Sequence, residues 1–269
     1  MERAIPGQPR WAELAAPHLA RYLAAAEHVR SRRVLDAGSG AGYGAALLKA
    51  AGAVAVQGVD ADADAVCQAR QRFAAPGLDF HVDDCETLAT LASPFDVICC
   101  FEVIEHLQRP ERFLAQAARL LAADGLLLVS SPDRAATPPF VTGQPRNSFH
   151  VHEWYGDEFR ALLLGSFAEV ELRVQVESIA VESRRTAVAA LREGLMWSNP
   201  LLVFLWRKLR FGKGQRAWTR LAGLAAPAPA DYPIVPAPLA SVFGTPAYHF
   251  ALCRGGRRMS PSPSGRAPE

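Results

Sequence analysis

Residues 33–134 alternate between short apolar segments and longer amphipathic ones, and this alternation is the strongest constraint on the fold. Five segments have the apolar character of buried strands: RVLDAG, AVAVQGVD, LDFHVDD, FDVICCF and LLLVSSPD. Most of the segments between them carry apolar residues at helical spacing. Buried strands separated by helices favour a parallel sheet that is covered on both faces. The sequence therefore predicts a doubly wound α/β fold, with a helix over residues 11–30 ahead of the first strand.

The remainder of the chain is predicted to complete this sheet around an insertion. Residues 156–167 are typical of a helix, and residues 169–178 and 247–254 are typical of strands. Between those two strands, residues 180–224 have a helical pattern and residues 225–240 form an Ala/Pro-rich linker. The predicted parts are a helical cap (1–32), the core (33–180), a basic, aromatic insertion with its linker (181–240), the final strand (241–254) and a disordered tail (255–269).

Four glycines follow the first predicted strand, in the segment VLDAGSGAGYG from Val34 to Gly44. A loop of this kind lies at the carboxyl edge of a parallel sheet, where open α/β folds bind ligands. A tight turn that binds nothing is the alternative. A nucleoside triphosphate loop would end in G-K-[ST], whereas this loop continues as GYGAA, which argues against that class of ligand.

Acidic residues at three successive strand ends narrow the range of possible ligands. Asp60 ends the second strand, about 20 residues after the loop, where an acid binds the hydroxyls of a ribose. Asp36 lies beside the loop, where a carboxylate repels a pyrophosphate and suits a cation. Asp84 ends the third strand, where a carboxylate can accept from an adenine amino group. S-adenosylmethionine, an adenosine with a sulfonium and an ammonium, is the cofactor that these acids predict.

The motifs VLDAGSGAGYG, GVDADADAV, DDCETLATLASPFDVICCFEVIEHL and LLAADGLLLVSSPD resemble the successive motifs of class I S-adenosylmethionine-dependent methyltransferases, from about residue 19 to residue 134. The resemblance implies a Rossmann-like, mostly parallel, seven-stranded sheet with an antiparallel last strand, here preceded by the helical insertion. It also implies cofactor contacts, namely Asp36, Gly38, Ser39 and Gly40 at the methionine part, Asp60 with Ala61 at the ribose, Asp84 and Cys85 at the adenine, and Phe101 and Glu102 beside the methyl group. Ser39 stands where the family often has Cys.

The segments FEVIEHL and RNSFHVHEW supply candidates for the acceptor side. Methyl transfer from a sulfonium is an in-line displacement, and a hydroxyl acceptor must lose a proton. Glu102 and His106 follow the fourth strand, and His150 lies in the loop after the fifth strand, over the same edge of the sheet. We expect His106 or His150 to be the general base. In the alternative interpretation, Glu102 binds the loop backbone, and the histidines cap helices or pack against neighbouring side chains.

The same residues also resemble a metal site. E-x-x-E-H followed by F-H-x-x-E-W is similar to the pattern of small-RNA 2′-O-methyltransferases, in which two glutamates and two histidines hold a divalent ion. The matching ligands here are Glu102, Glu105, His106 and His150. Such mixed ligation suits Mn²⁺ or Zn²⁺ better than Mg²⁺. A metal is not favoured, because E-x-x-E-H is also widespread among small-molecule methyltransferases of this class.

The loop after the fifth strand resembles that of bacterial methyltransferases of polysaccharide and O-antigen synthesis. Their signature R-N-x-[FY]-H-x-x-E-[LFWY] is met by Arg146, Asn147, Phe149, His150, Glu153 and Trp154, and in that group Tyr22 would reach the cofactor from the N-terminal helix. The resemblance implies O-methylation of a glycan or another small hydroxylated acceptor. A metal-assisted RNA 2′-O-methyltransferase and a non-catalytic cofactor-binding subunit are the alternatives.

The insertion concentrates positive charge, with nine Lys/Arg and one Glu between residues 184 and 220. Its aromatic and basic residues at 197–220 suit a peripheral contact with an anionic membrane that carries a lipid-linked glycan. A helical lid over the site is the structural alternative, and nucleic acid is a less favoured partner.

Cysteine usage and apolar runs bear on location. The five cysteines include no C-x-x-C pair, which fits a reducing cytosol. The N-terminal segment lacks a basic-then-apolar signal pattern, and the apolar run PLLVFLWRKLRF is shorter than the roughly 20 residues of a membrane span. We expect a cytoplasmic location, with peripheral contact at the inner face of the membrane as a further alternative.

Overall fold

The computed structural model describes residues 11–92, 94–136, 147–178, 228–240 and 244–256. The chain divides into two compact units. The larger unit comprises Tyr22–Arg173 and Tyr248–Glu269, and the smaller unit comprises Met1–Arg21 and Val174–Ala247.

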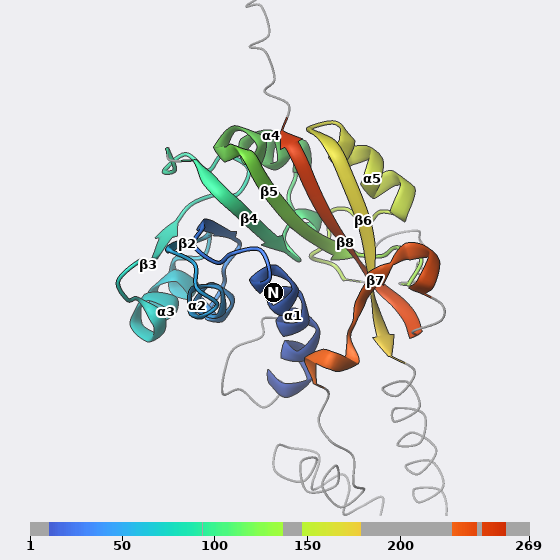
Figure 1. The fold of residues 1–269 in the computed structure, drawn as a ribbon, viewed down its shortest axis with the longest axis horizontal. Helices are drawn as coiled ribbons and strands as arrows, with labels where there is room; N and C mark the ends of the chain where they lie inside the picture. Colours follow the sequence, from blue (N-terminus) through green and yellow to red (C-terminus); the bar gives the residue numbers. More distant parts are fainter. Residues whose placement is uncertain (1–10, 93, 137–146, 179–227, 241–243, 257–269) are drawn as a thin grey trace, which may run out of the picture. The chain divides into compact units, whose positions relative to one another are not determined.

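A mostly parallel sheet forms the centre of the larger unit (Figure 1). Its strands are β1 (Arg33–Ala37), β2 (Ala55–Asp60), β3 (Leu78–Val82), β4 (Phe95–Phe101), β5 (Leu121–Pro132), β6 (Phe167–Ser178) and β8 (Gly244–Gly256). The end of β6, from Val174, and the start of β8, up to Ala247, belong to the smaller unit. The strands follow the order β3-β2-β1-β4-β5-β8-β6. Neighbours from β3 to β5 are parallel, and β8 is antiparallel to β5. The predicted α/β fold class, with an antiparallel strand from the C-terminal part, is confirmed.

Helices connect these strands. They are α1 (Trp11–Ala26), α2 (Tyr43–Ala50), α3 (Ala63–Phe73), α4 (Pro110–Leu120) and α5 (Gly156–Leu164), with short 3₁₀ turns η1 (Ile104–His106), η2 (Pro229–Asp231) and η3 (Ala237–Leu239). In the larger unit α2 and α3 pack against β2 and β3, and α4 packs against β5. The start of α3 is set by Asp62, whose carboxylate accepts from the N–H groups of Asp64 and Ala65.

The core of the larger unit lies between the central strands and their helices. Leu35 of β1, Ile98 of β4 and Val129 of β5 are completely buried, as are Phe113 of α4 and Phe159 of α5. Large apolar side chains that are closely packed resist local movement. The carboxyl ends of β1, β2 and β4 therefore present their side chains from a rigid platform.

Two sequence predictions about element limits are wrong. The segment PERFLAQAARLLAADG has the pattern of a helix that starts at Pro110 and ends near Gly125. The helix ends at Leu120 instead, because Leu121 is extended and pairs with Phe95 at the start of β4. The sheet has eight strands among the described residues instead of seven. The additional strand is β7 (Ile234–Pro236), which lies next to β6 in the smaller unit, within the segment predicted as a linker.

A buried polar network holds the smaller unit together. The Arg21 guanidinium donates to Gln175 Oε1, and Gln175 Nε2 donates to the carbonyls of Pro17 and Tyr232 at 3.0 and 3.3 Å. Arg21 and Gln175 are both completely buried. The network ties α1 to β6 and to the segment before β7.

Several predicted features fall outside the described residues. They are the basic segment 197–220, Arg146 of the loop signature and residues 257–269 of the predicted tail. The first two residues of that tail, at 255 and 256, belong to β8. No helix within the described ranges is long and apolar enough to cross a bilayer.

Candidate active site

The glycine loop joins β1 to α2 at the carboxyl edge of the sheet. Gly38, Gly40 and Gly42 have φ angles of 77°, 51° and 84°, in the left-handed region that favours glycine. A Cβ added at Gly40 would meet no protein atom within 4 Å, so this backbone borders open space. The loop therefore offers bare backbone to a ligand at this point, as expected from the sequence.

Tyr22 and Asp36 form a buried pair behind the loop. The Tyr22 hydroxyl lies 3.0 and 3.2 Å from the two Asp36 carboxylate oxygens, and Asp36 is completely buried. Burial, together with the nearby charge of Asp60, raises the pKa of Asp36 to about 7 against the lowering effect of the Tyr22 hydrogen bond. The Tyr22 ring meets the edges of Tyr43 and Phe101, with centroids 5.8 and 5.1 Å away.

Asp60 connects the end of β2 to the glycine loop. Its Oδ2 accepts the N–H of Gly40 at 2.8 Å, and its Oδ1 accepts the N–H of Asp62 at 2.9 Å. Each carboxylate oxygen can accept a further hydrogen bond. The geometry is thus compatible with the predicted contact to ribose hydroxyls, and it gives Asp60 a second task that the sequence did not predict, which is to hold the loop. Ala61 beside it is exposed.

The three residues after β3 differ in their surroundings. Asp83 is buried and accepts from the N–H and hydroxyl of Thr90 at 2.9 and 2.6 Å, so it stabilises the following turn. Asp84 is exposed, and its Oδ1 accepts from the N–H of Glu86. Cys85 is buried, and burial raises the pKa of its thiol well above the usual range. Asp84 is thus the exposed aspartate of this turn, and its contact with the adenine stays a prediction.

The end of β4 changes direction sharply. Phe101 is buried and stacks on Phe250 of β8, with ring centroids 5.8 Å apart. Glu102, the next residue, has a φ of 56°, an unusual value for a residue other than glycine. Strained backbone of this kind is concentrated at functional sites. The turn carries the chain directly into η1, which holds Glu105 and His106.

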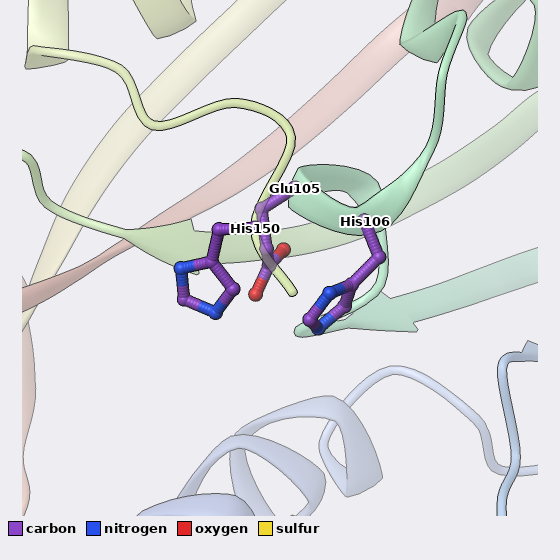
Figure 2. A group of neighbouring side chains, drawn as sticks. All are labelled: Glu105, His106 and His150. Carbon is purple, nitrogen blue, oxygen red and sulfur yellow. The ribbon is translucent and has the colours of Figure 1, made fainter. Parts of the chain in front are cut away.

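Glu105, His106 and His150 form the second part of the site (Figure 2). One potential ligand atom from each residue lies within 4.8 Å of the others. In the view of Figure 2 the Glu105 carboxylate lies between the two imidazole rings, whose centroids are 5.0 Å apart. Glu105 is completely buried, and the histidines are partly exposed. Three of the four residues of the predicted metal set thus come together, and Glu102 is not part of this group.

The hydrogen bonds of His106 define its tautomer. Its Nδ1 lies 2.8 Å from the carbonyl oxygen of Phe149, which can only accept, so Nδ1 carries the proton and Nε2 is the basic atom of the neutral ring. Burial lowers the pKa of His106 below its usual value, and His150 lowers it further, against the raising effects of the Phe149 carbonyl and Glu102. The ring is therefore neutral at neutral pH.

The partners of His150 differ from those of His106. Its Nδ1 lies 2.8 Å from Oε1 of Glu153, and its Nε2 lies 2.9 Å from Nδ2 of Asn147. The Asn147 Oδ1 accepts the N–H of Phe149, so its NH₂ group faces His150. In this arrangement His150 Nε2 already accepts a hydrogen bond. Of the two predicted general bases, His106 has the geometry that fits the role better.

The chain just after His150 is fixed at two points. The N–H groups of Val151 and His152 donate to the Glu105 carbonyl at 2.8 and 3.1 Å. Further along, the Trp154 carbonyl accepts from the N–H of Arg134 at 3.1 Å and lies 3.0 Å from His249 Nε2. His150 is thus held against η1 by backbone contacts that a sequence pattern does not reveal.

Asp133 and His249 also belong to the site, and neither was expected there from the sequence. The two side chains are 3.5 Å apart, both are largely buried, and together they support the Trp154 end of the loop. Asp133 directly follows β5 at the carboxyl edge, where β1 and β2 end with the acids Asp36 and Asp60 within their last two residues, and this position was a usable signal. No local pattern marked His249, because its position depends on the antiparallel pairing of β8 with β5.

Together the sheet order, the open glycine loop and the acids at the strand ends define an α/β protein of the Rossmann-like methyltransferase class. A methyltransferase domain family matches residues 10–184, which is more than half of the chain. The chain belongs to this family of S-adenosylmethionine-dependent methyltransferases. S-adenosyl-L-methionine is the methyl donor of the family, and the buried carboxylate and open-sided loop fit a cofactor that carries positive charge.

Two curated relatives and one solved structure illustrate the similarity. A probable S-adenosylmethionine-dependent methyltransferase of Mycobacterium tuberculosis is 37% identical over 156 residues, 58% of this chain and 56% of that protein. A ubiquinone biosynthesis O-methyltransferase of Glaesserella parasuis is 35% identical over 115 residues, 39% of this chain and 47% of that protein. A possible histamine N-methyltransferase of Thermotoga maritima has a TM-score of 0.56 at 17% identity, over 91% of this chain and 92% of that one.

These similarities support the fold and the family but do not identify the acceptor. The chain spans about half the length of the curated relatives it matches. The identity to the solved structure is low enough that it supports the fold alone. Neither curated relative is named for polysaccharide synthesis, so the acceptor has to be argued from the site.

Proposed function

We propose that this protein is a methyltransferase that methylates a hydroxyl oxygen of a small acceptor, with His106 as general base. When bound, S-adenosylmethionine supplies the methyl group. Asp36, Gly38, Ser39, Gly40 and Tyr22 would hold its methionine part, Asp60 and Ala61 its ribose, Asp84 and Cys85 its adenine, and Phe101 and Glu102 would line the region of the methyl group. The bare backbone at Gly40 and the buried carboxylate of Asp36 support this assignment.

The tautomer of His106 is the observation that carries the proposal. The Phe149 carbonyl fixes the proton on Nδ1, which leaves Nε2 to accept the proton of an acceptor hydroxyl. Because burial lowers the pKa of this ring, it is neutral and ready to accept at neutral pH. His150, whose two ring nitrogens contact Glu153 and Asn147, would shape the acceptor side beside His106.

The acceptor is proposed to be a glycan or a similar polyhydroxylated molecule. Phe149 is 55% exposed beside the two histidines, and Val151 and Tyr155 of the same loop are also exposed. An aromatic ring displayed beside polar groups suits the apolar face and hydroxyl rim of a sugar. The resemblance of the loop signature to that of polysaccharide methyltransferases supports the same acceptor class. A lipid-linked glycan at the inner membrane face would be one such acceptor.

Calorimetry and a transfer assay test the proposal in turn. We expect S-adenosylhomocysteine to bind with measurable heat and to raise the melting temperature. S-adenosylhomocysteine formation is then followed with a panel of sugars and polysaccharide fractions, and with a small RNA. We expect turnover on a glycan that His106→Gln reduces strongly. Binding of the cofactor without turnover on any acceptor would favour the non-catalytic alternative.

A metal-assisted RNA 2′-O-methyltransferase is the second candidate, and the grouping of Glu105, His106 and His150 favours it. One carboxylate and two imidazoles would suit Mn²⁺ or Zn²⁺. Calorimetric titration of the protein with Mn²⁺ and with Zn²⁺ tests the metal site in the absence of any acceptor. The RNA methyltransferase would be the better assignment if the protein binds a metal tightly, if Glu105→Gln abolishes that binding, and if a chelator stops turnover on RNA. We expect chelator to leave turnover unchanged.

A further inference from the structure

The Tyr22 hydroxyl and the Asp36 carboxyl form a buried, hydrogen-bonded pair behind the glycine loop. Asp36 has no exposed surface, and Tyr22 is 5% exposed. Both lie in the larger unit, where the Tyr22 ring is so close to α2 that a Cβ at Gly44 would come within 2.0 Å of it. A carboxylate in such a place has lost nearly all contact with water, so its charge must be stabilised by what lies around it.

The groups that face Asp36 from the surrounding elements stabilise its charge poorly. Tyr22 of α1 donates a hydrogen bond, and the backbone of Ala45 in α2 donates another. Asp60 of β2 is an acid of the same sign. Among the residues that the structure describes, the other titratable groups whose electrostatics are tied to this carboxyl are the thiols of Cys85, Cys99 and Cys100 and the Tyr43 phenol near Tyr22. These groups are acids, and their ionisation would only add negative charge.

We propose that cofactor binding at the glycine loop ionises Asp36 and releases its proton to solvent, so that cofactor affinity is linked to pH near neutrality. This inference rests on the proposed function, because it requires that the positive group of the cofactor lies near this carboxyl. A cation there favours the charged carboxylate, and the proton leaves for the buffer. Burial holds the pKa of Asp36 at about 7 before binding, so the carboxyl carries a proton to release at neutral pH.

Proton release sets a definite pH dependence. Binding at pH 6 starts from a largely protonated carboxyl and releases close to one proton. Binding at pH 8.5 starts from a largely ionised carboxyl and releases almost none. Below neutrality the apparent affinity therefore falls by up to about tenfold for each pH unit, because the proton competes with the positive charge of the cofactor.

The experiment is calorimetry of S-adenosylmethionine and of S-adenosylhomocysteine in two buffers of different ionisation enthalpy, at pH 6, 7 and 8.5. The difference in heat between buffers counts the protons released. Release with both ligands identifies the ammonium as the cation, and release with S-adenosylmethionine alone identifies the sulfonium. Equal heats in the two buffers at pH 6 and 7 would overturn the inference while leaving the proposed function intact. Absence of any binding would overturn both.

Two variants assign the proton to this pair. Asp36→Asn should bind without proton release, whereas Asp79→Asn, which changes an exposed carboxyl on β3, should release protons as the wild type does. Tyr22→Phe keeps the carboxyl but removes the hydrogen bond that lowers its pKa, so release should persist to higher pH. Unchanged proton counts in Tyr22→Phe and Asp36→Asn would contradict the assignment. If Asp36→Asn does not bind the cofactor, the assignment depends on whether proton release in Tyr22→Phe extends to higher pH than in the wild type.

Discussion

The cofactor side and the acceptor side of the site are built in different ways. On the cofactor side, Tyr22 of α1 donates a hydrogen bond to Asp36 of β1, and the charge of Asp60 at the end of β2 acts on Asp36. On the acceptor side, His106 and Phe149 are 43 residues apart, and they meet because a loop folds back over η1. The Asp36 side chain on the cofactor side is completely buried, whereas the Phe149 ring on the acceptor side is 55% exposed.

This difference separates what the fold requires from what the reaction requires. Substitutions on the cofactor side disturb packed side chains, so stability and binding should fall together. Substitutions on the acceptor side change partly exposed groups, so turnover should change while the fold and cofactor binding persist. The following predictions test that separation, from the largest expected effect to the smallest.

Gly44→Ala should have the largest effect on stability. Its Cβ would lie 2.0 Å from the Tyr22 ring, which would have to move and lose its contact with Asp36. Overpacking of this severity costs about 3 kcal/mol or more. The control is Gly156→Ala at the start of α5, where the nearest atom would be 3.5 Å from the new Cβ. Denaturant unfolding should separate the two variants, and equal midpoints would show that the cofactor side is less tightly packed than we describe.

Asp36→Asn should change how stability depends on pH. The pKa of Asp36 is about 7 in the folded protein and 3.8 at its ordinary value, so the folded state binds more protons between these limits. Stability from this group is therefore lost as pH rises from about 4 to 7. Without cofactor, the variant should lose about 2 to 3 kcal/mol less than the wild type between pH 5 and pH 8. Parallel stability curves for the two proteins would contradict this.

His106→Gln should reduce methyl transfer by about 100-fold or more, the usual contribution of a general base. Its affinity for S-adenosylhomocysteine should stay within about twofold, since no cofactor contact is removed. In the wild type the midpoint of the acid limb of the rate should lie below 6.5, because burial lowers the pKa of His106. A loss of cofactor binding that equals the loss of turnover would end the proposed division between the two sides.

Glu153→Gln should have a smaller effect on the same reaction. The amide keeps a hydrogen-bond acceptor for His150 Nδ1 but removes the charge that lies 2.8 Å away. We expect turnover to fall by about tenfold, which corresponds to about 1.4 kcal/mol. Steady-state kinetics should show the loss in kcat. A loss as large as that of His106→Gln would make His150 the better candidate for the base.

Phe149→Ala should leave stability almost unchanged, within about 0.5 kcal/mol, because the ring is more exposed than buried. Its backbone carbonyl would still hold His106. If the ring contacts the acceptor, KM for the acceptor should rise while kcat changes little. A fall in kcat at unchanged KM would show that the side chain positions His106 instead.

Local patterns predicted much of the cofactor side. The alternation of strands and helices, the glycine loop and the acids at the strand ends are all short-range features, and the structure places them at one edge of the sheet. The limits of elements were less predictable. Leu121 leaves the helix that its sequence favours because β4 supplies a partner strand, and β7 forms only because β6 lies beside it.

The sequence by itself determined the fold class, the family and the residue types available on each side, because these follow from periodicity and from motifs within single turns of chain. The tertiary structure decided which of those residues meet. It joined His106 to Phe149, drew Glu105 and His150 beside them and enclosed Asp36 with Tyr22. Tautomers and pKa values depend on the groups a side chain faces and on the water it loses. Such groups come from distant parts of the chain, so those properties appear only after folding.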